Sequence, residues 1–272
     1  MTESQLRERE PRVVLRLRAA GCVYAEEEAR LLCTEAHTSA ELEEMVQRRV
    51  EGEPLEVIVG WAEFHGLRVH LEKGVFVPRR RTEFLVDRAI ELCGAGGVVV
   101  DLCCGAGALG VAVATAVNGA YPRTPVTLYA TDVEHPAVEC ARRNVSSLGG
   151  SVYEGDLFEP LPRSLLGRVD VLLANVPYVP SEEIALLPPE ARDYEPRVTL
   201  DGGADGLDVL RRVAADARAW LAPGGHLFVE ASARQAPAAA RIVAAGGLHA
   251  SIMRSEDEDA TVIVGMRSLL VE

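Results

Sequence analysis

The segment VVVDLCCGAGALG, residues 98–110, joins an apolar run to a glycine-rich turn and then to a second apolar run. The three valines favour a short buried β-strand, and the stretch that begins at Leu109 favours a helix. Glycines at a strand-to-helix turn allow the backbone to approach a ligand closely. The segment therefore predicts an α/β sheet with a ligand site at the carboxyl end of its first strand.

Apolar strands alternate with helices from this segment to the C-terminus. The strands are expected at residues 98–100, 126–130, 152–153, 169–174, 226–230, 250–252 and 261–264. The helices are expected at residues 84–92, 109–117, 136–148, 207–221 and 238–245. This alternation indicates a mostly parallel sheet that is covered by helices on both faces. Residues 179–206 form a long loop rich in proline, glycine and acidic residues, which is typical of lids and binding segments.

The first part of the chain has a different pattern. Residues 1–54 are expected to be helical, with an acidic helix start at Glu26–Glu28. Val57–Val59 and Leu67–Leu71 flank a glycine-containing turn and predict a β-hairpin. We therefore expect an N-terminal helical domain at residues 1–54, a β-hairpin linker at residues 55–78 and the main α/β domain at residues 79–272.

The composition weighs against several classes of protein. The chain has 272 residues, 48% of them hydrophobic, and a formal net charge of −13. Such an acidic chain is a poor match for nucleic-acid phosphates, which favour a basic surface. The start Met1–Gln5 is polar and no apolar stretch reaches membrane length, so we expect a cytoplasmic protein. The six cysteines show no metal-binding spacing, which predicts free thiols and no metal site.

Acidic side chains follow the first three expected strands. Asp132 follows the second strand, where a carboxylate can accept both hydroxyls of a ribose, and Asp156 follows the third, where it can accept an adenine amino group. Asp101 ends the first strand and would repel a pyrophosphate, but not the ammonium group of S-adenosylmethionine. These acids favour S-adenosylmethionine as the cofactor, while the spacing GAGALG at residues 105–110 leaves a dinucleotide open.

The tetrapeptide NVPY, residues 175–178, follows the fourth expected strand. The amide oxygen of Asn175 and a backbone carbonyl of one of the next two residues can accept both hydrogens of an incoming –NH2 group. The proline stiffens this backbone, and Tyr178 can stack on a flat group or contact a cationic methyl donor. The same residues are also common in ordinary turns. Because the glycine turn and Asp132 also follow expected strands, the three features together favour a site that methylates a planar nitrogen.

The order of these motifs resembles that of the class I S-adenosylmethionine-dependent methyltransferases. More narrowly, it resembles the protein-(glutamine-N5) methyltransferases of the HemK or PrmC type, which modify the glutamine of a Gly-Gly-Gln motif in peptide chain release factors. The resemblance runs from about Glu53 to the C-terminus, and its most family-specific part is the pattern VPRxxTE at Val77–Glu83. It implies a Rossmann-like, seven-stranded mixed sheet with helices on both faces and a small helical N-terminal domain on the substrate side.

The resemblance also implies roles for individual residues. Catalytic roles are implied for Asn175, Pro177 and Tyr178. Cofactor contacts are implied for Asp101, Cys103, Gly105, Gly107, Asp132, Asp156, Leu157 and Asn175. Substrate contacts are implied for Arg79, Thr82, Asn175, Val176, Pro177 and Tyr178.

The chain departs from the family pattern at three places. Cys103 stands where the family usually has glycine, and Val176 stands where it usually has proline. Arg80-Arg81 replaces a usual Pro-Asp pair. The first two changes keep the turn and the Asn, Pro and Tyr of the tetrapeptide in place. The two arginines alter the mouth of the site. They leave open the hypothesis that this chain is a paralogue that modifies a different target.

The expected activity is therefore the transfer of a methyl group from S-adenosylmethionine to the side-chain amide nitrogen of a glutamine in a release factor or a related protein. Three alternatives stay open: a nucleic-acid adenine N6 methyltransferase, a small-molecule methyltransferase and a non-catalytic S-adenosylmethionine-binding module. The acidic charge weighs against a nucleic-acid substrate, and the intact Asn175, Pro177 and Tyr178 weigh against a non-catalytic module. We expect a monomer that binds neither membrane nor metal.

Overall fold

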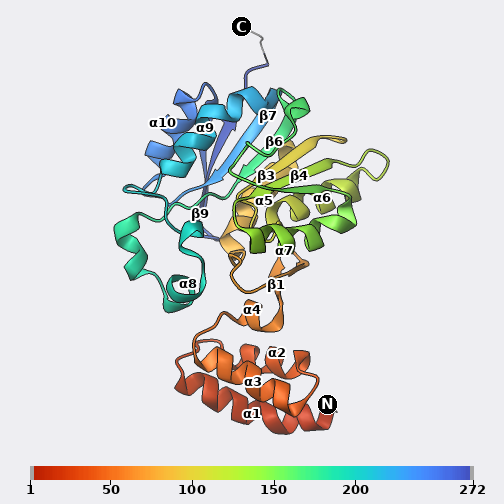
Figure 1. The fold of residues 1–272 in the computed structure, drawn as a ribbon, viewed down its shortest axis with the longest axis vertical. Coiled ribbons are helices and arrows are strands. Elements are labelled where there is room, and N and C mark those ends of the chain that lie inside the picture. Colours follow the sequence, from red (N-terminus) through yellow and green to blue (C-terminus); the bar gives the residue numbers. More distant parts are fainter. Residues whose placement is uncertain (1–2, 270–272) are drawn as a thin grey trace.

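The structure is a computed structural model that describes residues 3–269, so Met1 and Thr2 of the polar start lie outside the described residues. A group of helices at the N-terminus stands apart from a larger α/β body, and a short connection joins the two (Figure 1). No helix within residues 3–269 is long and apolar enough to cross a membrane. The domain boundaries expected at residues 54 and 78 stay predictions.

The N-terminal helices bury a small hydrophobic core of their own. They are α1 (Glu3–Ala19), α2 (Ala25–Glu35) and α3 (Ser39–Val50). Leu17, Leu32 and Val46 lie fully buried in this core. The hydroxyl of Thr38 caps α3 by accepting the backbone N–H of Glu41 at 3.1 Å. The helical N-terminal region expected from the sequence is confirmed.

The connection between the two bodies differs in part from the prediction. The strand expected at Val57–Val59 is wrong, because these residues belong to the short helix α4 (Leu55–Val59). Gly60 ends this helix in a left-handed conformation, with φ of 81°. The hairpin begins only after it and consists of β1 (Trp61–Phe64) and β2 (Leu67–His70), which pair antiparallel. Packing of Ile58 against the N-terminal core outweighs the strand preference of the β-branched run.

In the described part of the chain, seven strands form one mixed sheet, as expected. Its order is β5-β4-β3-β6-β7-β9-β8. The bounds are β3 (Val98–Leu102), β4 (Thr127–Asp132), β5 (Ser151–Glu154), β6 (Val169–Ala174), β7 (Leu221–Glu230), β8 (His249–Ser255) and β9 (Ala260–Met266). Strands β3 to β7 are parallel, whereas β9 runs antiparallel to β7 and to β8. The strand order reverses between β3 and β6, where such sheets bind ligands.

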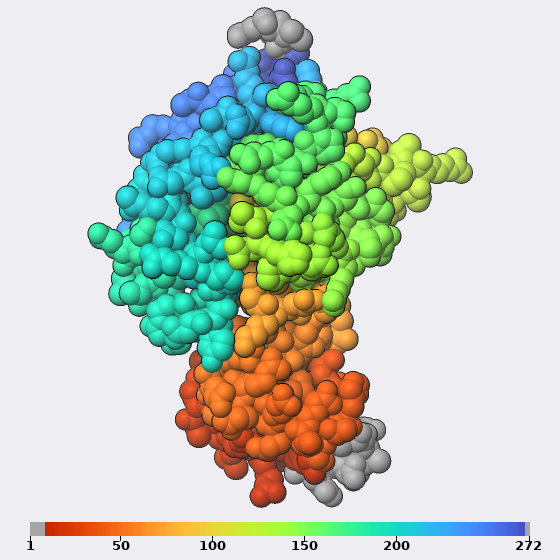
Figure 2. Space-filling view, viewed as in Figure 1, coloured from red at the N-terminus to blue at the C-terminus, as the bar shows by residue number. Residues whose placement is uncertain are grey.

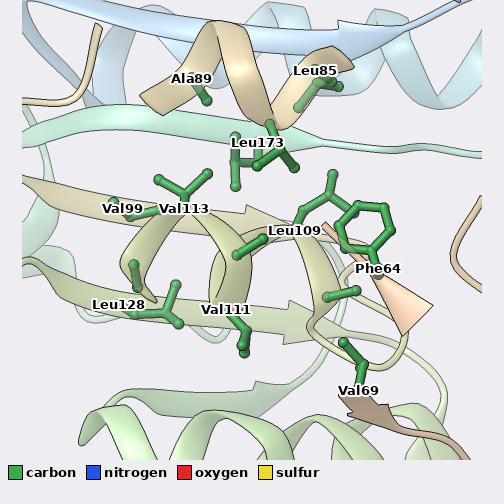
Figure 3. Packing of buried hydrophobic residues seen from close by; sticks show 14 of the residues in the cluster. Phe64, Val69, Leu85, Ala89, Val99, Leu109, Val111, Val113, Leu128 and Leu173 are labelled. Atoms are coloured by element: carbon green, nitrogen blue, oxygen red, sulfur yellow. The ribbon is translucent and has the colours of Figure 1, made fainter. Parts of the chain in front are cut away.

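Helices cover both faces of the sheet (Figure 1). One face carries α5 (Glu83–Leu92), α6 (Ala108–Ala120) and α7 (His135–Val145), and the other carries α9 (Asp208–Trp220) and α10 (Ala236–Ala245). Successive strand residues alternate between the two cores, so Val99 and Leu173 face one while Val100 and Leu172 face the other. Figure 3 shows that Phe64 of the hairpin inserts into the first core. The connection is thereby attached to the α/β body.

The segment 179–206, expected to be a long loop, contains short helices. They are the 3-10 helices Ser181–Leu186 and Arg197–Thr199 and the α-helix α8 (Pro189–Tyr194). Arg49 of α3 forms an ion pair with Glu190 at 2.6 Å. The hydroxyl of Tyr194 donates to the carbonyl of Glu51 at 2.7 Å. The segment, blue-green in Figure 2, therefore bridges the α/β body and the N-terminal helices.

The carboxyl group of Asp101 holds the start of α6 against the end of β3. Asp101 is 1% exposed, and its Oδ2 accepts the backbone N–H of Gly110 at 2.9 Å. A Cβ atom on Gly110 would lie 2.8 Å from a methyl group of Leu128 and 3.1 Å from this same oxygen, so the close approach favours glycine. Burial raises the pKa of the Asp101 carboxyl to about 8; the Gly110 N–H opposes this shift and the nearby Asp132 adds to it.

This raised pKa predicts a loss of stability as the pH rises. Between about pH 4 and pH 8, folded Asp101 holds a proton that the unfolded chain has released, so the free energy of unfolding should fall by up to about 1.4 kcal/mol per pH unit. Asp101→Asn keeps an acceptor for Gly110 and cannot titrate. In urea unfolding of the ligand-free protein at pH 5 to 8, the variant should gain stability over the parent protein as the pH rises. Exposed Asp216→Asn is the control, and equal pH slopes for the parent and Asp101→Asn would contradict the prediction.

Candidate functional site

The glycine turn and the NVPY tetrapeptide meet where the strand order reverses. Leu102 at the end of β3 pairs with Ala174 at the end of β6 in parallel register. The residues that follow, 103–107 and 175–178, therefore begin side by side. A cavity of about 460 Å³ is lined by residues of both segments and is partly open to solvent. Two motifs that lie about 70 residues apart in the sequence thus share one cavity.

Most of the predicted site residues line this cavity. They are Arg79, Asp101, Cys103, Gly105, Asp132, Asp156, Leu157, Asn175, Val176, Pro177 and Tyr178. Gly107 and Thr82 are not on its wall. Gly107 is the N-cap of α6, and Thr82 is 1% exposed behind the wall. Arg212 and Glu190 also line the cavity, although the sequence analysis did not predict them.

The turn after β3 requires backbone conformations that favour glycine. Gly105 and Gly107 have φ values of 54° and 77°, in the left-handed region. A Cβ atom on Gly107 would also lie only 3.3 Å from a methyl group of Val145. Cys103 has a φ of 52°, a conformation that costs a residue with a side chain about 1–2 kcal/mol. The chain therefore keeps the glycine-type turn with some strain at Cys103.

Asp132 ties the end of β4 to the glycine turn. Its Oδ2 accepts the backbone N–H of Gly105 at 2.8 Å, and its Oδ1 accepts that of Glu134 at 2.9 Å. Burial raises the pKa of this carboxyl, while the backbone N–H groups oppose the shift. A carboxylate offers about four acceptor positions, so both oxygens can still accept hydroxyl hydrogens from a ligand in the cavity.

Asp156 follows β5 on the same wall and has a partner that the sequence did not reveal. Arg212 of α9 donates to its Oδ2 at 2.5 Å. Next to it, Leu157 is buried with a φ of 48°, and its carbonyl accepts the hydroxyl hydrogen of Thr131 at 2.9 Å. An acidic acceptor therefore lies beside an apolar side chain, which suits the edge and the face of a flat base. Arg212 escaped prediction because one arginine on a polar helix face carries no sequence signal.

Asn175 offers its side chain to the cavity. The residue is partly buried, and within residues 3–269 its amide makes no hydrogen bond with the protein. Val176 is 2% exposed and anchors the backbone in the core, while Pro177 follows on the cavity wall. A polar amide without an internal partner, at the edge of a cavity, is available to a ligand.

Tyr178 is held by charged neighbours. Its hydroxyl donates to Oε1 of Glu230 at 2.8 Å and accepts a hydrogen bond from Nη2 of Arg81 at 2.6 Å. Burial, followed by the charge of Glu230, raises the pKa of the phenol well above its usual value, so Tyr178 stays a neutral donor. Glu230 was missed by the sequence analysis. It ends β7, so its sequence signal is a polar residue at the end of the fifth expected strand.

Arg79 and Thr82 from the VPRxxTE pattern are both engaged within the protein. Arg79 Nη2 donates to Glu195 Oε1 at 2.5 Å, and the same oxygen accepts the backbone N–H of Val77. Burial raises the pKa of Glu195, and Arg79 opposes that shift. The hydroxyl of Thr82 donates to Glu230 Oε2 at 2.5 Å. This segment therefore forms the rim of the cavity and supports its wall.

The wall fits S-adenosylmethionine in shape and in chemistry. In the glycine turn, Gly105 lines the cavity with backbone alone, in a conformation that favours glycine. Asp132 and Asp156 supply acceptors for hydroxyl and amino groups, and Leu157 supplies an apolar surface next to Asp156. In the part of the chain that the structure describes, no cluster of His, Cys, Asp or Glu residues is arranged to hold a metal ion.

Known proteins are similar to this chain in sequence and in fold. Residues 66–186 match the family described as methyltransferase small domain. The release factor glutamine methyltransferase of Gloeobacter violaceus is 39% identical over 230 residues, which is 82% of this chain and 77% of that protein. The release factor glutamine methyltransferase of Bradyrhizobium diazoefficiens is 38% identical over 213 residues, covering 76% of this chain and 69% of that protein.

Solved structures agree on the fold. A methyltransferase from Pyrococcus furiosus has a TM-score of 0.52 at 16% identity, covering 75% of this chain and 90% of that one. A 16S rRNA methyltransferase of T. thermophilus, in complex with AdoMet and guanosine, has a TM-score of 0.53 at 18% identity, covering 76% and 49%. Together with the relatives, these likenesses confirm the expected class I methyltransferase fold. The chain belongs to the family of release factor glutamine methyltransferases, enzymes that use S-adenosylmethionine as their cofactor.

Proposed function

We propose that this chain methylates the side-chain amide nitrogen of a glutamine in a peptide chain release factor, within the site formed by the glycine turn and residues 175–178. The observation that carries the proposal is the amide of Asn175, which borders the cavity without a hydrogen-bond partner among the described residues. It lies across the β3–β6 junction from the turn that fits the cofactor. Support for the target comes from the relatives, which are named for release factors.

The proposed role of Asn175 is to orient a weak nucleophile. An amide nitrogen is a poor nucleophile because its lone pair is delocalised into the carbonyl, so placement and removal of water matter most. The Asn175 side-chain oxygen and a backbone carbonyl at Val176 or Pro177 would accept the two amide hydrogens. These contacts strengthen as positive charge develops on the nitrogen, which stabilises the transition state. When bound, S-adenosylmethionine supplies the activated methyl group.

Other residues are proposed to support this geometry. The cofactor would contact Asp101, Cys103, Gly105, Asp132, Asp156, Leu157 and Asn175, while Gly107 would act indirectly by shaping the turn as the N-cap of α6. Tyr178 would pack its ring beside the planar amide of the glutamine. Arg79 would meet the substrate at the cavity rim. Thr82 would act through Glu230, because its hydroxyl is buried against that carboxylate.

The substrate class can be tested directly. The purified protein, labelled S-adenosylmethionine and a recombinant release factor should yield label on one glutamine amide, located by mass spectrometry. The matched substrate is the same factor with that glutamine replaced by alanine, which should take up no label. Label on RNA, on DNA or on a small molecule instead of the factor would contradict the proposal. The expected cytoplasmic location and monomeric state stay predictions.

Asn175→Ala should reduce turnover by about a hundredfold or more, because it removes one hydrogen bond that strengthens in the transition state. Calorimetric titration should find the affinity for S-adenosylmethionine changed by no more than a few fold. Asn118→Ala is the control, since this amide bonds the backbone of Val126 outside the cavity. An unchanged turnover of Asn175→Ala would remove Asn175 from the mechanism.

A further inference from the structure

The guanidinium group of Arg81 forms a hydrogen bond with the hydroxyl of Tyr178 in the site. We propose that Arg81 is a positioning residue, which fixes the Tyr178 ring beside the substrate amide. The inference deepens the proposed function and rests on it. Arg81 is one of the two arginines that replace the Pro-Asp pair of the family pattern. The contacts of Arg81 argue that this change serves the position of Tyr178 rather than the choice of target.

Arg81, Tyr178 and Glu230 form a closed triangle of hydrogen bonds. Arg81 donates through Nη2 to the Tyr178 hydroxyl at 2.6 Å and through Nε to Glu230 Oε1 at 3.0 Å. Tyr178 donates to the same Glu230 oxygen at 2.8 Å. The planar guanidinium presents its donors in a fixed fork, so one side chain can bind both partners at once. The triangle therefore sets the direction of the phenol ring as well as its distance.

Glu230 is a fixed anchor for this triangle. Its side chain is 5% exposed at the end of β7, and its second oxygen accepts the hydroxyl hydrogen of Thr82 at 2.5 Å. A buried carboxylate needs a charged or hydrogen-bonding partner, and Arg81 supplies the positive charge. An aspartate at position 81 would place a second negative charge beside Glu230 and could not donate to either partner. The arginine therefore makes a contact that the usual acid cannot make.

The main chain of Tyr178 is held as firmly as its hydroxyl. Its carbonyl accepts a hydrogen bond from Nε2 of Gln235 at 2.9 Å, and Gln235 also binds the carbonyl of Asp205. A Cβ atom on Gly206 would lie 2.2 Å from the same Tyr178 carbonyl, so only glycine allows this approach. With both ends of Tyr178 engaged, the ring is the part left to face the cavity.

The neighbouring arginine provides a matched control. Arg80 is exposed and lies outside the cavity wall, and its side chain has no hydrogen bond or ion pair among the residues that the structure describes. The side chain of Arg81 is half exposed, and it binds both Tyr178 and Glu230. A general effect of positive charge at the mouth would involve both residues, whereas a positioning effect would involve Arg81 alone.

A double-mutant cycle on turnover tests the proposal. Arg81→Ala and Tyr178→Phe should each lower kcat by about tenfold or more, because a misplaced ring no longer holds the reacting amide in line. The double variant should be no slower than the slower single variant, since both changes break the same contact. Arg81→Lys should restore kcat only in part, because an ammonium lacks the fork. S-adenosylmethionine affinity should stay unchanged throughout, and Arg80→Ala should match the parent protein.

Two results would overturn the proposal: multiplicative losses of kcat in the double variant, or an equal loss in Arg80→Ala. Failure of the proposed function is distinguishable, because the parent protein would then leave the release factor unlabelled. In that case the same cycle is measured by urea unfolding of the ligand-free chain. The loss of stability in the double variant should be smaller than the sum of the single losses, and additive losses would refute the contact itself.

Discussion

The parallel pairing of β3 with β6 is the constraint on which the site depends. Their hydrogen bonds fix Leu102 opposite Ala174, and both strands end at this pair of residues. A shift by one residue would turn every side chain of a strand to the other core, so the buried faces determine the register. The glycine turn and the NVPY tetrapeptide are therefore placed by the hydrophobic core rather than by contact with each other.

Around that junction, several carboxyl groups of the site have hydrogen-bond partners within the protein. Asp101 and Asp132 accept backbone N–H groups, whereas Glu230 is paired with Arg81 and Thr82. Groups that are already bonded need not reorganise when charge develops nearby, which is the physical basis of preorganised catalysis. Asn175 differs from these residues because no described residue occupies its amide. The carboxyl groups of the wall are thus held by hydrogen bonds within the protein, whereas the amide of Asn175 is available to the substrate in the proposed reaction.

Much of the fold could be predicted because it follows from local patterns. The seven strands and their covering helices follow from period and apolar content, and the strand at Val169–Ala174 has the predicted bounds. Local patterns gave the wrong secondary structure where tertiary packing determined it, as at Val57–Val59, which is helical and not a strand. The short helices within residues 179–206 were also missed, because proline and acidic residues signal a loop in isolation. Here the segment is supported by its contacts with Glu51 and Arg49.

The sequence by itself determined the order of the elements, the glycine turn and the polar residues at four strand ends, because each depends on neighbours a few positions away. Only the tertiary structure decided which strand ends are adjacent and which side chains meet across them. Arg81 and Tyr178 are 97 positions apart, and Tyr178 and Glu230 are 52 positions apart. Contacts over such separations form only when the buried faces of distant elements pack together, and no local pattern records that event.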